Sequence, residues 1–416
     1  MKLLLTLVAV AAGVICVAGP AAASPSVRYG IQDDAWLLYG AGTLESRVET
    51  FDRLGVELVR FTIDWSKVEA RRGAHDWSAV DPVLRGLQTS GIRAVVTLNG
   101  TPRWANGGRS ANWAPTSGST FAAFATAAAK RYPWVKDWLI WNEPNQRRWL
   151  RPTTPKTYVI KLLNPAYAAI HRASRGTRVG GGVTAPRASH GGVSPVAWIR
   201  GMRAAGARLD AYAHHPYPIN RFQTPWSGAC MHCETITMAS LERLQREVKN
   251  AWGGAKKIWL TEFGYQTNPP DRLLGVSPDT QSRFIGEAAW RVFKAKNVEM
   301  LIHYLYKDEP DVGRWQSGLV TAAGKAKPAR AGFMVAAAQA YRIGRTTAVW
   351  GHVRTGEGRR LYVLQQFRGG GWHTVNGAYR TTARGFLYRY VRAGKGSKLR
   401  LLHTPTRTYS PVLTVR

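Results

Sequence analysis

Acidic residues are scarce in this chain. Its 416 residues include 25 aspartates and glutamates against 58 lysines and arginines, so the formal net charge is +33. Such an excess favours contact with an anionic surface, polymer or substrate, although an arginine-rich composition without a partner is the alternative. Nucleic acid is not the expected partner, because the chain has no recognition-helix or zinc-finger pattern.

Cysteine is also rare, with three residues in the whole chain. Cys16 lies in the first apolar run, which leaves Cys230 and Cys233 in the tetrapeptide "CMHC". In an oxidising compartment this spacing favours a disulfide, with free thiols as the alternative. A zinc site would need two further ligands, so we expect no metal. No phosphate-loop or dinucleotide glycine pattern opens the chain, and we expect no cofactor.

Long apolar runs are confined to the N-terminus, "MKLLLTLVAVAAGVICVAGPAAAS". A lysine, an apolar stretch and three alanines predict a secretory signal peptide over residues 1–23, cleaved near Ala23. An uncleaved anchor is the alternative, but the run is short for a membrane span. The expected mature protein has no membrane span and is secreted, extracellular or cell-wall associated. A hydrophobic content of 45% excludes wholesale disorder.

Strand-like and helix-like runs alternate eight times between about residues 27 and 343. The strand-like runs include "VELVRFTI", "IRAVVTLN", "VKDWLIW", "KIWLTEF" and "VEMLIHYLY". Each is followed by a longer segment with helical periodicity, the last being "AKPARAGFMVAAAQAYRIG". Eight such units predict a (β/α)8 barrel over residues 24–345, with a doubly wound open sheet as the alternative.

Residues 346–416 have a different pattern. Short strand-like runs such as "AVWGHVR", "RLYVLQQF" and "GFLYRYVRA" are separated by glycines, and Glu357 is the single acid among many basic residues. This predicts a small basic antiparallel β-domain, similar to a sandwich, packed on the barrel. It is the part expected to contact an anionic cell-wall polymer.

Two apolar strands end on a carboxylate. Glu143 follows "WLIWN" at the end of the fourth strand, and Glu262 lies in "IWLTEFGY" at the end of the seventh. Active groups of (β/α)8 barrels lie at the carboxyl ends of the strands. Two carboxylates that face each other across a cleft are the groups that glycoside hydrolysis requires. An Asn-Glu-Pro triplet alone could instead be a helix-entry turn with a solvated glutamate.

The segments "IWNEPN" and "LTEFG" resemble glycoside hydrolase clan A, a superfamily of retaining (β/α)8 enzymes, and more weakly its families 39 and 5. The segments "DWSKVEARRGAHDWSAVDPVLRGLQTSGIRAVVTL", "HHPYP" and "SGLVTAAGKAKPA" extend the resemblance over roughly residues 27–340. It implies Glu143 as the acid/base and Glu262 as the nucleophile.

The same resemblance implies substrate-binding roles for further residues. Asn142 matches the residue that bonds the sugar 2-hydroxyl, and Arg60 matches an arginine that keeps the nucleophile charged. His215 and Tyr217 match sixth-strand residues near the nucleophile. Tyr306 is the expected eighth-strand aromatic residue, where the clan often has tryptophan. A structural ion pair for Arg60 and a core position for His215 are the alternatives.

Loop aromatic residues are further candidates, because flat rings stack on the apolar faces of sugars. Trp104 in "TPRWAN" and Trp315 in "GRWQSG" border the expected cleft. Asp33 and Asp34 are expected to be solvated strand-end acids, and Glu69 a loop anchor beside Trp65.

The sequence therefore predicts a secreted retaining glycoside hydrolase that cleaves β-linked glycosides or polysaccharide. A non-catalytic carbohydrate or wall-polymer binding protein on the same scaffold is the alternative. The sugar stays open among xylosides, glucosides, arabinosides and acidic glycans.

Overall fold

Eight parallel strands close into a barrel in the computed structural model, which describes Ser24 and residues 26–416. The signal-peptide prediction falls on residues outside the described ones. The barrel order is the sequence order, and β8 pairs with β1 to close it. The strands are β1 (Arg28–Gln32), β2 (Leu58–Asp64), β3 (Arg93–Asn99), β4 (Asp137–Ile140), β5 (Arg178–Thr184), β6 (Ala211–His214), β7 (Lys257–Phe263) and β8 (Val298–Tyr304).

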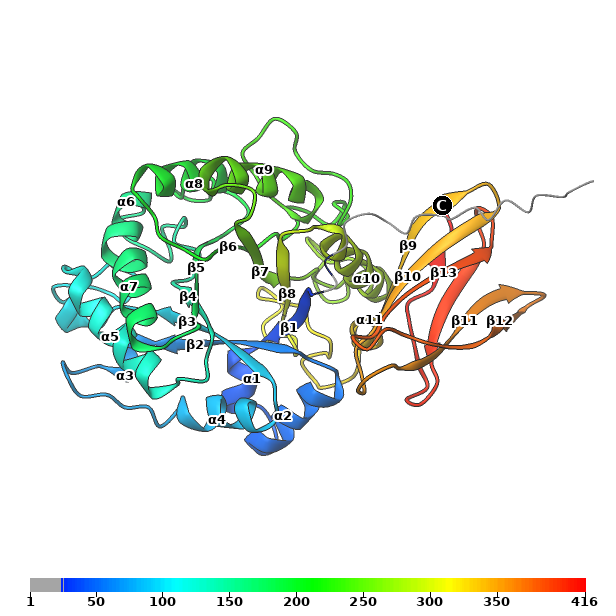
Figure 1. Ribbon diagram of the computed structural model, residues 1–416, viewed down its shortest axis with the longest axis horizontal. Helices are drawn as coiled ribbons and strands as arrows, with labels where there is room; N and C mark the ends of the chain where they lie inside the picture. Colours follow the sequence, from blue (N-terminus) through cyan, green and yellow to red (C-terminus); the bar gives the residue numbers. More distant parts are fainter. Residues whose placement is uncertain (1–23, 25) are drawn as a thin grey trace, which may run out of the picture.

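Helices surround this barrel on its outer side (Figure 1). Several begin with the side-chain caps that the sequence suggests; Thr43, for example, accepts a bond from Ser46 N at the start of α2. The longer helices are α2 (Leu44–Arg53), α4 (Asp81–Thr89), α5 (Gly118–Arg131), α7 (Asn164–Ala173), α8 (Pro195–Ala204), α9 (Leu241–Trp252) and α10 (Pro278–Lys294). The shorter ones are α1 (Asp34–Tyr39), α3 (Trp65–Val68), η1 (Arg103–Ala105), α6 (Pro155–Tyr158), η2 (Val159–Leu163), η3 (Met238–Ser240) and α11 (Pro328–Met334).

Apolar side chains fill the barrel interior, and their size explains the glycine-rich β5. Trp259 of β7 and Leu139 of β4 are fully buried in this inner cluster. A Cβ atom on Gly180 would lie 2.7 Å from both of these side chains. The run "RVGGGVT" is therefore a strand whose missing side chains make room for large neighbours.

Two antiparallel sheets form the C-terminal part. One has the order β13-β10-β9, and the other β12-β11-β14-β15 with β16 beside β14. Leu399, Leu401 and Val349 belong to the apolar core of these sheets. Their strands are β9 (Val335–Ile343), β10 (Thr346–Val353), β11 (Leu361–Arg368), β12 (Gly371–Arg380), β13 (Phe386–Arg392), β14 (Lys398–His403), β15 (Thr408–Tyr409) and β16 (Leu413–Thr414).

The expected last helix is wrong beyond Met334. Helix α11 ends there, and Val335–Ile343 continues as strand β9, which pairs with β10. A Cβ atom on Gly286 of α10 would lie 2.3 Å from Ala337 O, so α10 and β9 approach closely. The alanines of β9 are thus the small residues that this contact requires.

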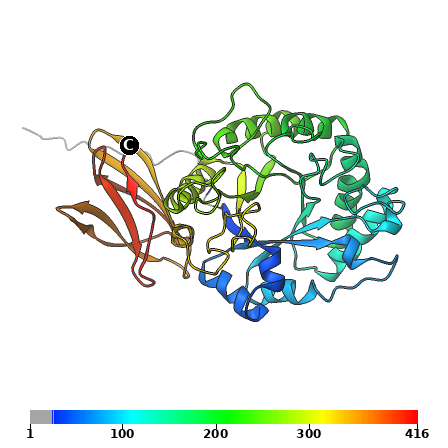
Figure 2. The same ribbon diagram turned by 180° about the vertical axis from the view of Figure 1, so that it is seen from behind.

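The C-terminal sheets pack against the outside of the barrel, where α10 and α11 lie between its strands and the sheets (Figures 1 and 2). Trp290 of α10 lies 5.5 Å from Trp350, measured between ring centroids. Arg384 donates to Glu57 Oε1 at 2.7 Å and to Val27 O at 2.9 Å. The two parts therefore share a packed interface, as expected.

Cys230 and Cys233 form the expected disulfide, in the long loop that follows β6. Within the described part of the chain, no helix combines the length and apolar character needed to cross a membrane.

Candidate active site

The candidate site lies at the carboxyl ends of the barrel strands, where β2, β4, β6 and β7 each contribute a polar side chain. Glu143 follows β4, and Glu262 is the second-to-last residue of β7. Arg60 projects from β2, and His215 follows β6. The positions predicted from four distant segments therefore converge.

The chain bends sharply after β4, and this bend positions Glu143. Trp141 and Glu143 have positive φ angles of 71° and 38°. Residues other than glycine rarely adopt this backbone conformation. The bend is held by bonds from Trp141 N to Leu98 O at 2.8 Å and from Glu143 N to Val183 O at 2.9 Å. Such backbone conformations persist where the surroundings enforce them, commonly at functional sites.

Two donors reach the Glu262 carboxylate. Arg60 Nη1 donates to its Oε1, and the Tyr217 hydroxyl donates to its Oε2 at 3.0 Å. The Glu262 residue is 8% exposed, and Arg60 is fully buried. These two donors, one of them charged, fix the orientation of the carboxylate.

Arg60 is itself fixed by neighbours on three other strands or loops. Its Nε donates to Thr97 Oγ1 at 2.9 Å, its Nη1 to Gln32 Oε1 at 2.8 Å and its Nη2 to Asn142 Oδ1 at 2.8 Å. The guanidinium therefore orients Glu262 and Asn142 with the same rigid group. Gln32 and Thr97 were not anticipated, because nothing in their own segments marks them as polar contacts inside a barrel.

His215 lies between the two glutamates as a neutral ring. Burial lowers its pKa to about 3. Its Nε2 lies 3.3 Å from Arg60 Nη1, and an arginine can only donate, so the ring proton belongs on Nδ1. Nδ1 lies 3.1 Å from Glu143 Oε1 and 3.5 Å from Glu262 Oε2. His215 thus donates from Nδ1 to Glu143 and lies close to Glu262.

Glu143 has a different environment. Its side chain is 18% exposed, and burial raises its pKa to about 7, with partial opposition from Arg60 and Arg148. A carboxyl group with this pKa holds a proton near neutral pH and can release it. The two glutamates are therefore chemically unequal.

The two carboxyl groups are close enough to act on one atom. One oxygen of each glutamate and a ring nitrogen of His215 all lie within 4.8 Å of one another. Three such groups could ligate a metal ion, but the Arg60 guanidinium already donates to Glu262 and lies beside His215. A second cation at this point would meet that positive charge directly.

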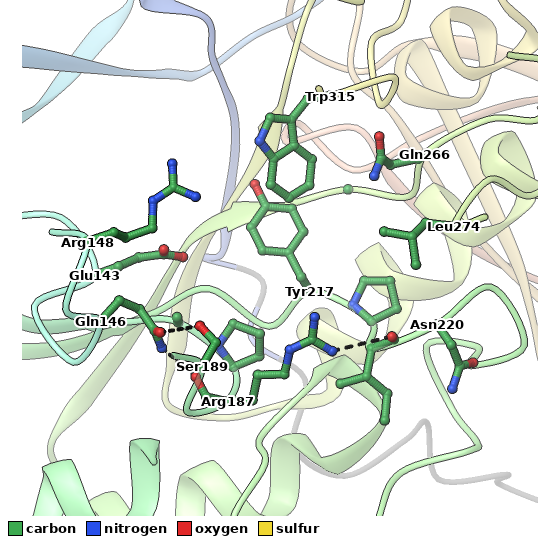
Figure 3. Close-up of a pocket in the computed structure, with 15 residues that line it drawn as sticks. Glu143, Gln146, Arg148, Arg187, Ser189, Tyr217, Asn220, Gln266, Leu274 and Trp315 are labelled. Carbon is green, nitrogen blue, oxygen red and sulfur yellow. Dashed lines mark hydrogen bonds between the residues drawn. The ribbon is translucent and has the colours of Figure 1, made fainter. Parts of the chain in front are cut away.

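A cavity opens beside Glu143 and is drawn in Figure 3. Its wall combines aromatic and hydrogen-bonding residues, which suits a sugar with apolar faces and many hydroxyls. Tyr217 and Trp315 lie against each other there, with centroids 4.7 Å apart. The remaining polar wall is formed by Gln146, Arg148, Arg187, Ser189, Asn220 and Gln266.

Two of the predicted aromatic residues lie elsewhere. The Trp104 indole donates to Glu69 O at 2.8 Å and packs edge-on against Trp65. Tyr306 is buried against Trp36 and Phe51 in the apolar core. Neither residue lines the cavity beside Glu143.

Tyr304, which no sequence pattern singled out, reaches the site instead of Tyr306. It lies 5.4 Å from Trp315 between ring centroids, and Glu262 contributes to raising its pKa. Tyr304 and Tyr306 are two residues apart at the end of β8. Because side chains alternate between the two faces of a strand, the sequence predicts that both rings point the same way. Only the chain path after β8 distinguishes the two rings.

The acids near the first two strands have structural positions. Asp33 is buried, not solvated: its Oδ1 accepts from Trp36 N and its Oδ2 from Lys307 N, both at 3.0 Å. Glu69 anchors its loop as expected, accepting from the Trp65 indole at 2.7 Å.

No protein-family model and no curated protein sequence matches this chain. Solved structures do. A family 39 glycoside hydrolase from Bacteroides cellulosilyticus WH2 superposes with a TM-score of 0.62 at 15% identity, over 89% of this chain and 81% of that one. The GH39 enzyme from Xanthomonas axonopodis pv. citri superposes with a TM-score of 0.59 at 14% identity, over 94% of this chain and 95% of that one.

A GH5_18 protein from Streptomyces cattleya gives a TM-score of 0.55 at 18% identity, over 75% of this chain and 79% of that one. At these identities the likeness establishes a shared fold. The fold class predicted from the sequence, a (β/α)8 barrel with a small C-terminal antiparallel β-domain, is confirmed.

Proposed function

We propose that this protein is a secreted retaining glycoside hydrolase, with the barrel as catalytic domain and the C-terminal sheets as accessory domain. The observation that carries the proposal is the pairing of two unequal glutamates, with oxygens within 4.8 Å, at the strand ends of the barrel. Retaining enzymes have carboxyl groups about 5–5.5 Å apart, whereas inverting enzymes leave about 6.5–9.5 Å for a water molecule. Fold neighbours described as glycoside hydrolases support the same reaction class.

In the first step, the Glu262 carboxylate attacks the anomeric carbon while Glu143 donates its proton to the departing glycosidic oxygen. The leaving alcohol departs, and a covalent glycosyl–Glu262 ester remains. In the second step, Glu143 removes a proton from water, the water oxygen bonds to the anomeric carbon, and the ester bond breaks. Two inversions retain the configuration of the sugar.

Neighbouring residues prepare each glutamate for its part. Arg60 and Tyr217 each donate a hydrogen bond to Glu262. Arg60 also donates to Asn142 Oδ1, and we expect Asn142 to contact the sugar. Neutral His215 adds an uncharged donor between the carboxyl groups without neutralising either one. Trp315 offers an aromatic face for stacking.

The experiment is a digestion of a panel of β-glycosides and polysaccharides, followed by proton NMR of the first product formed. A β-configured product that appears before mutarotation supports the proposal. An α-configured first product would contradict retention, and saccharide binding without any hydrolysis would favour the carbohydrate-binding alternative.

The positive charge of the C-terminal sheets suits a role in binding an anionic wall polymer. Residues 335–416 contain 15 lysines and arginines and the single acid Glu357. We expect the full chain to sediment with anionic wall polymer at low salt and to be released at high salt, because exposed charges are screened. Salt-independent retention would exclude this role.

A further inference from the structure

The cavity beside Glu143 lies on one side of the reacting centre. Glu143 lines it, whereas Glu262 does not; Tyr217, whose hydroxyl donates to Glu262, is part of its wall. If Glu143 protonates the departing oxygen, the space next to it and away from Glu262 holds the leaving group. This step rests on the proposed function, and it identifies the cavity as the leaving-group side of the site.

The charges of this cavity are unbalanced. Among the described residues that line it, Arg148 and Arg187 are cationic and Glu143 carries the only carboxyl group. Burial raises the pKa of Glu143 to about 7, so this carboxyl group is partly or fully neutral at and below that pH. The cavity therefore has a net positive charge in the state that donates the proton.

Both guanidinium groups keep free donors. In the part of the chain that the structure describes, the only ring contact of Arg148 is Trp149, 5.2 Å from its Cζ, and no hydrogen bond or ion pair involves its guanidinium. Arg187 makes a single long bond, 3.4 Å, to Ile219 O. Arg60, in contrast, is bonded by all three of its nitrogens.

The two loops that carry these arginines are braced to each other. Gln146 Nε2 donates to Arg187 O, and Ser189 Oγ donates to Gln146 Oε1, both at 2.5 Å (Figure 3). The Asn145 side chain adds two hydrogen bonds: its Nδ2 donates to Val193 O, and its Oδ1 accepts from Ala185 N. A prepositioned pair of loops reduces the ordering cost of binding.

We propose that the leaving-group side of this site accepts a negatively charged sugar unit, whose anionic oxygens bind Arg148 and Arg187. A guanidinium presents a planar fork of donors that matches a carboxylate, sulfate or phosphate. Asn220 and Gln266, which also line the cavity, are left to bond hydroxyls. The substrate class is thus an acidic glycan, cleaved on the reducing side of the sugar that binds over Glu262.

The test uses aryl glycosides that share one sugar and differ only in a charged substituent on the leaving phenol. Carboxylate, sulfate and phosphate versions are compared with the neutral phenol, over a panel of sugars, in the full chain. The measured quantity is the ratio of kcat/KM between charged and neutral substrates. Comparing this ratio between variants cancels the intrinsic difference between the phenols.

Arg148→Gln and Arg187→Gln should each lower this ratio by roughly tenfold to a hundredfold, as expected for loss of a hydrogen bond to a charged group. The matched control is Arg203→Gln, an exposed arginine of α8 outside the cavity, which should leave the ratio unchanged. The anion with the largest ratio identifies the preferred group.

A ratio unchanged in both cavity variants, in an active enzyme, would overturn this inference alone. Absence of hydrolysis across the whole panel would overturn the proposed function and, with it, this inference. Calorimetry with Glu262→Gln adds a readout that needs no turnover: an acidic oligosaccharide should bind more tightly than its carboxyl-reduced counterpart, and equal affinities would count against the inference.

Discussion

The ends of β4 and β7 carry the same side chain in different surroundings. Glu143 sits at a bend with positive φ, beside a neutral histidine, and burial raises its pKa to about 7. Glu262 lies near the end of strand β7 and accepts bonds from a buried arginine and a tyrosine hydroxyl. The two residues are both glutamates, and they differ in the groups that donate hydrogen bonds to them.

This difference explains how two identical groups can have opposite tasks at one pH. A carboxyl group whose surroundings oppose charge keeps its proton and can act as an acid, whereas one that receives charge-assisted donors remains available as a nucleophile. Substitutions that remove one side of this contrast should therefore have separable kinetic effects.

The largest effect is expected for Glu262→Gln. Without a nucleophile no covalent intermediate forms, so kcat should fall on the order of 10⁴-fold or more for every leaving group. Steady-state kinetics measure it, with Glu49→Gln on the exposed face of α2 as the control. Turnover close to the wild-type rate would contradict the assignment.

Glu143→Gln should have a smaller effect that depends on the leaving group. Loss of the proton donor should lower turnover of poor leaving groups by about 10²–10⁴-fold, and that of a nitrophenolate much less. A substrate series with phenols of different acidity measures this split. Equal losses across the series would indicate that Glu143 is not the acid.

The pH profile should locate the Glu143 proton. Because burial raises its pKa to about 7, the acid form is present below that pH and lost above it. The kcat/KM of the wild type should therefore decline as pH rises through about 7, and Glu143→Gln should abolish this alkaline limb. A limb that persists in the variant would belong to another group.

Arg60→Lys should lower kcat by roughly tenfold to a hundredfold. Lysine keeps the charge but cannot bond Glu262, Asn142, Thr97 and Gln32 from one rigid plane. Kinetics should be paired with urea unfolding. A lower unfolding midpoint with an unchanged kcat would show that Arg60 has a purely structural role.

Tyr217→Phe should produce the smallest effect, a loss of roughly tenfold in kcat. It removes one hydrogen bond to the Glu262 carboxylate and keeps the ring that packs on Trp315. Tyr167→Phe, which removes a bond to Asp210 outside the cavity, is the control. Equal kcat values in the two variants would exclude a positioning role for the Tyr217 hydroxyl.

Local sequence patterns determined the barrel, the two strand-end glutamates and the Cys230–Cys233 pairing. Apolar strand runs and helical stripes depend on neighbours within a few residues, so they can be read without a structure. Glu143 and Glu262 were identifiable because each interrupts such an apolar run where the barrel rule places chemistry. The spacing "CMHC" likewise brings its sulfurs together locally.

Only the tertiary structure decided the rest, because it depends on contacts between distant segments. Alanine-rich Val335–Ile343 reads as helix by propensity, but pairing with β10 and close packing on α10 make it a strand. Tyr304, the last residue of β8, lies beside Trp315 at the site, whereas Tyr306 packs against Trp36 in the core. The unequal environments of the two glutamates arise from Arg60, His215 and Tyr217, which only folding brings within hydrogen-bonding distance.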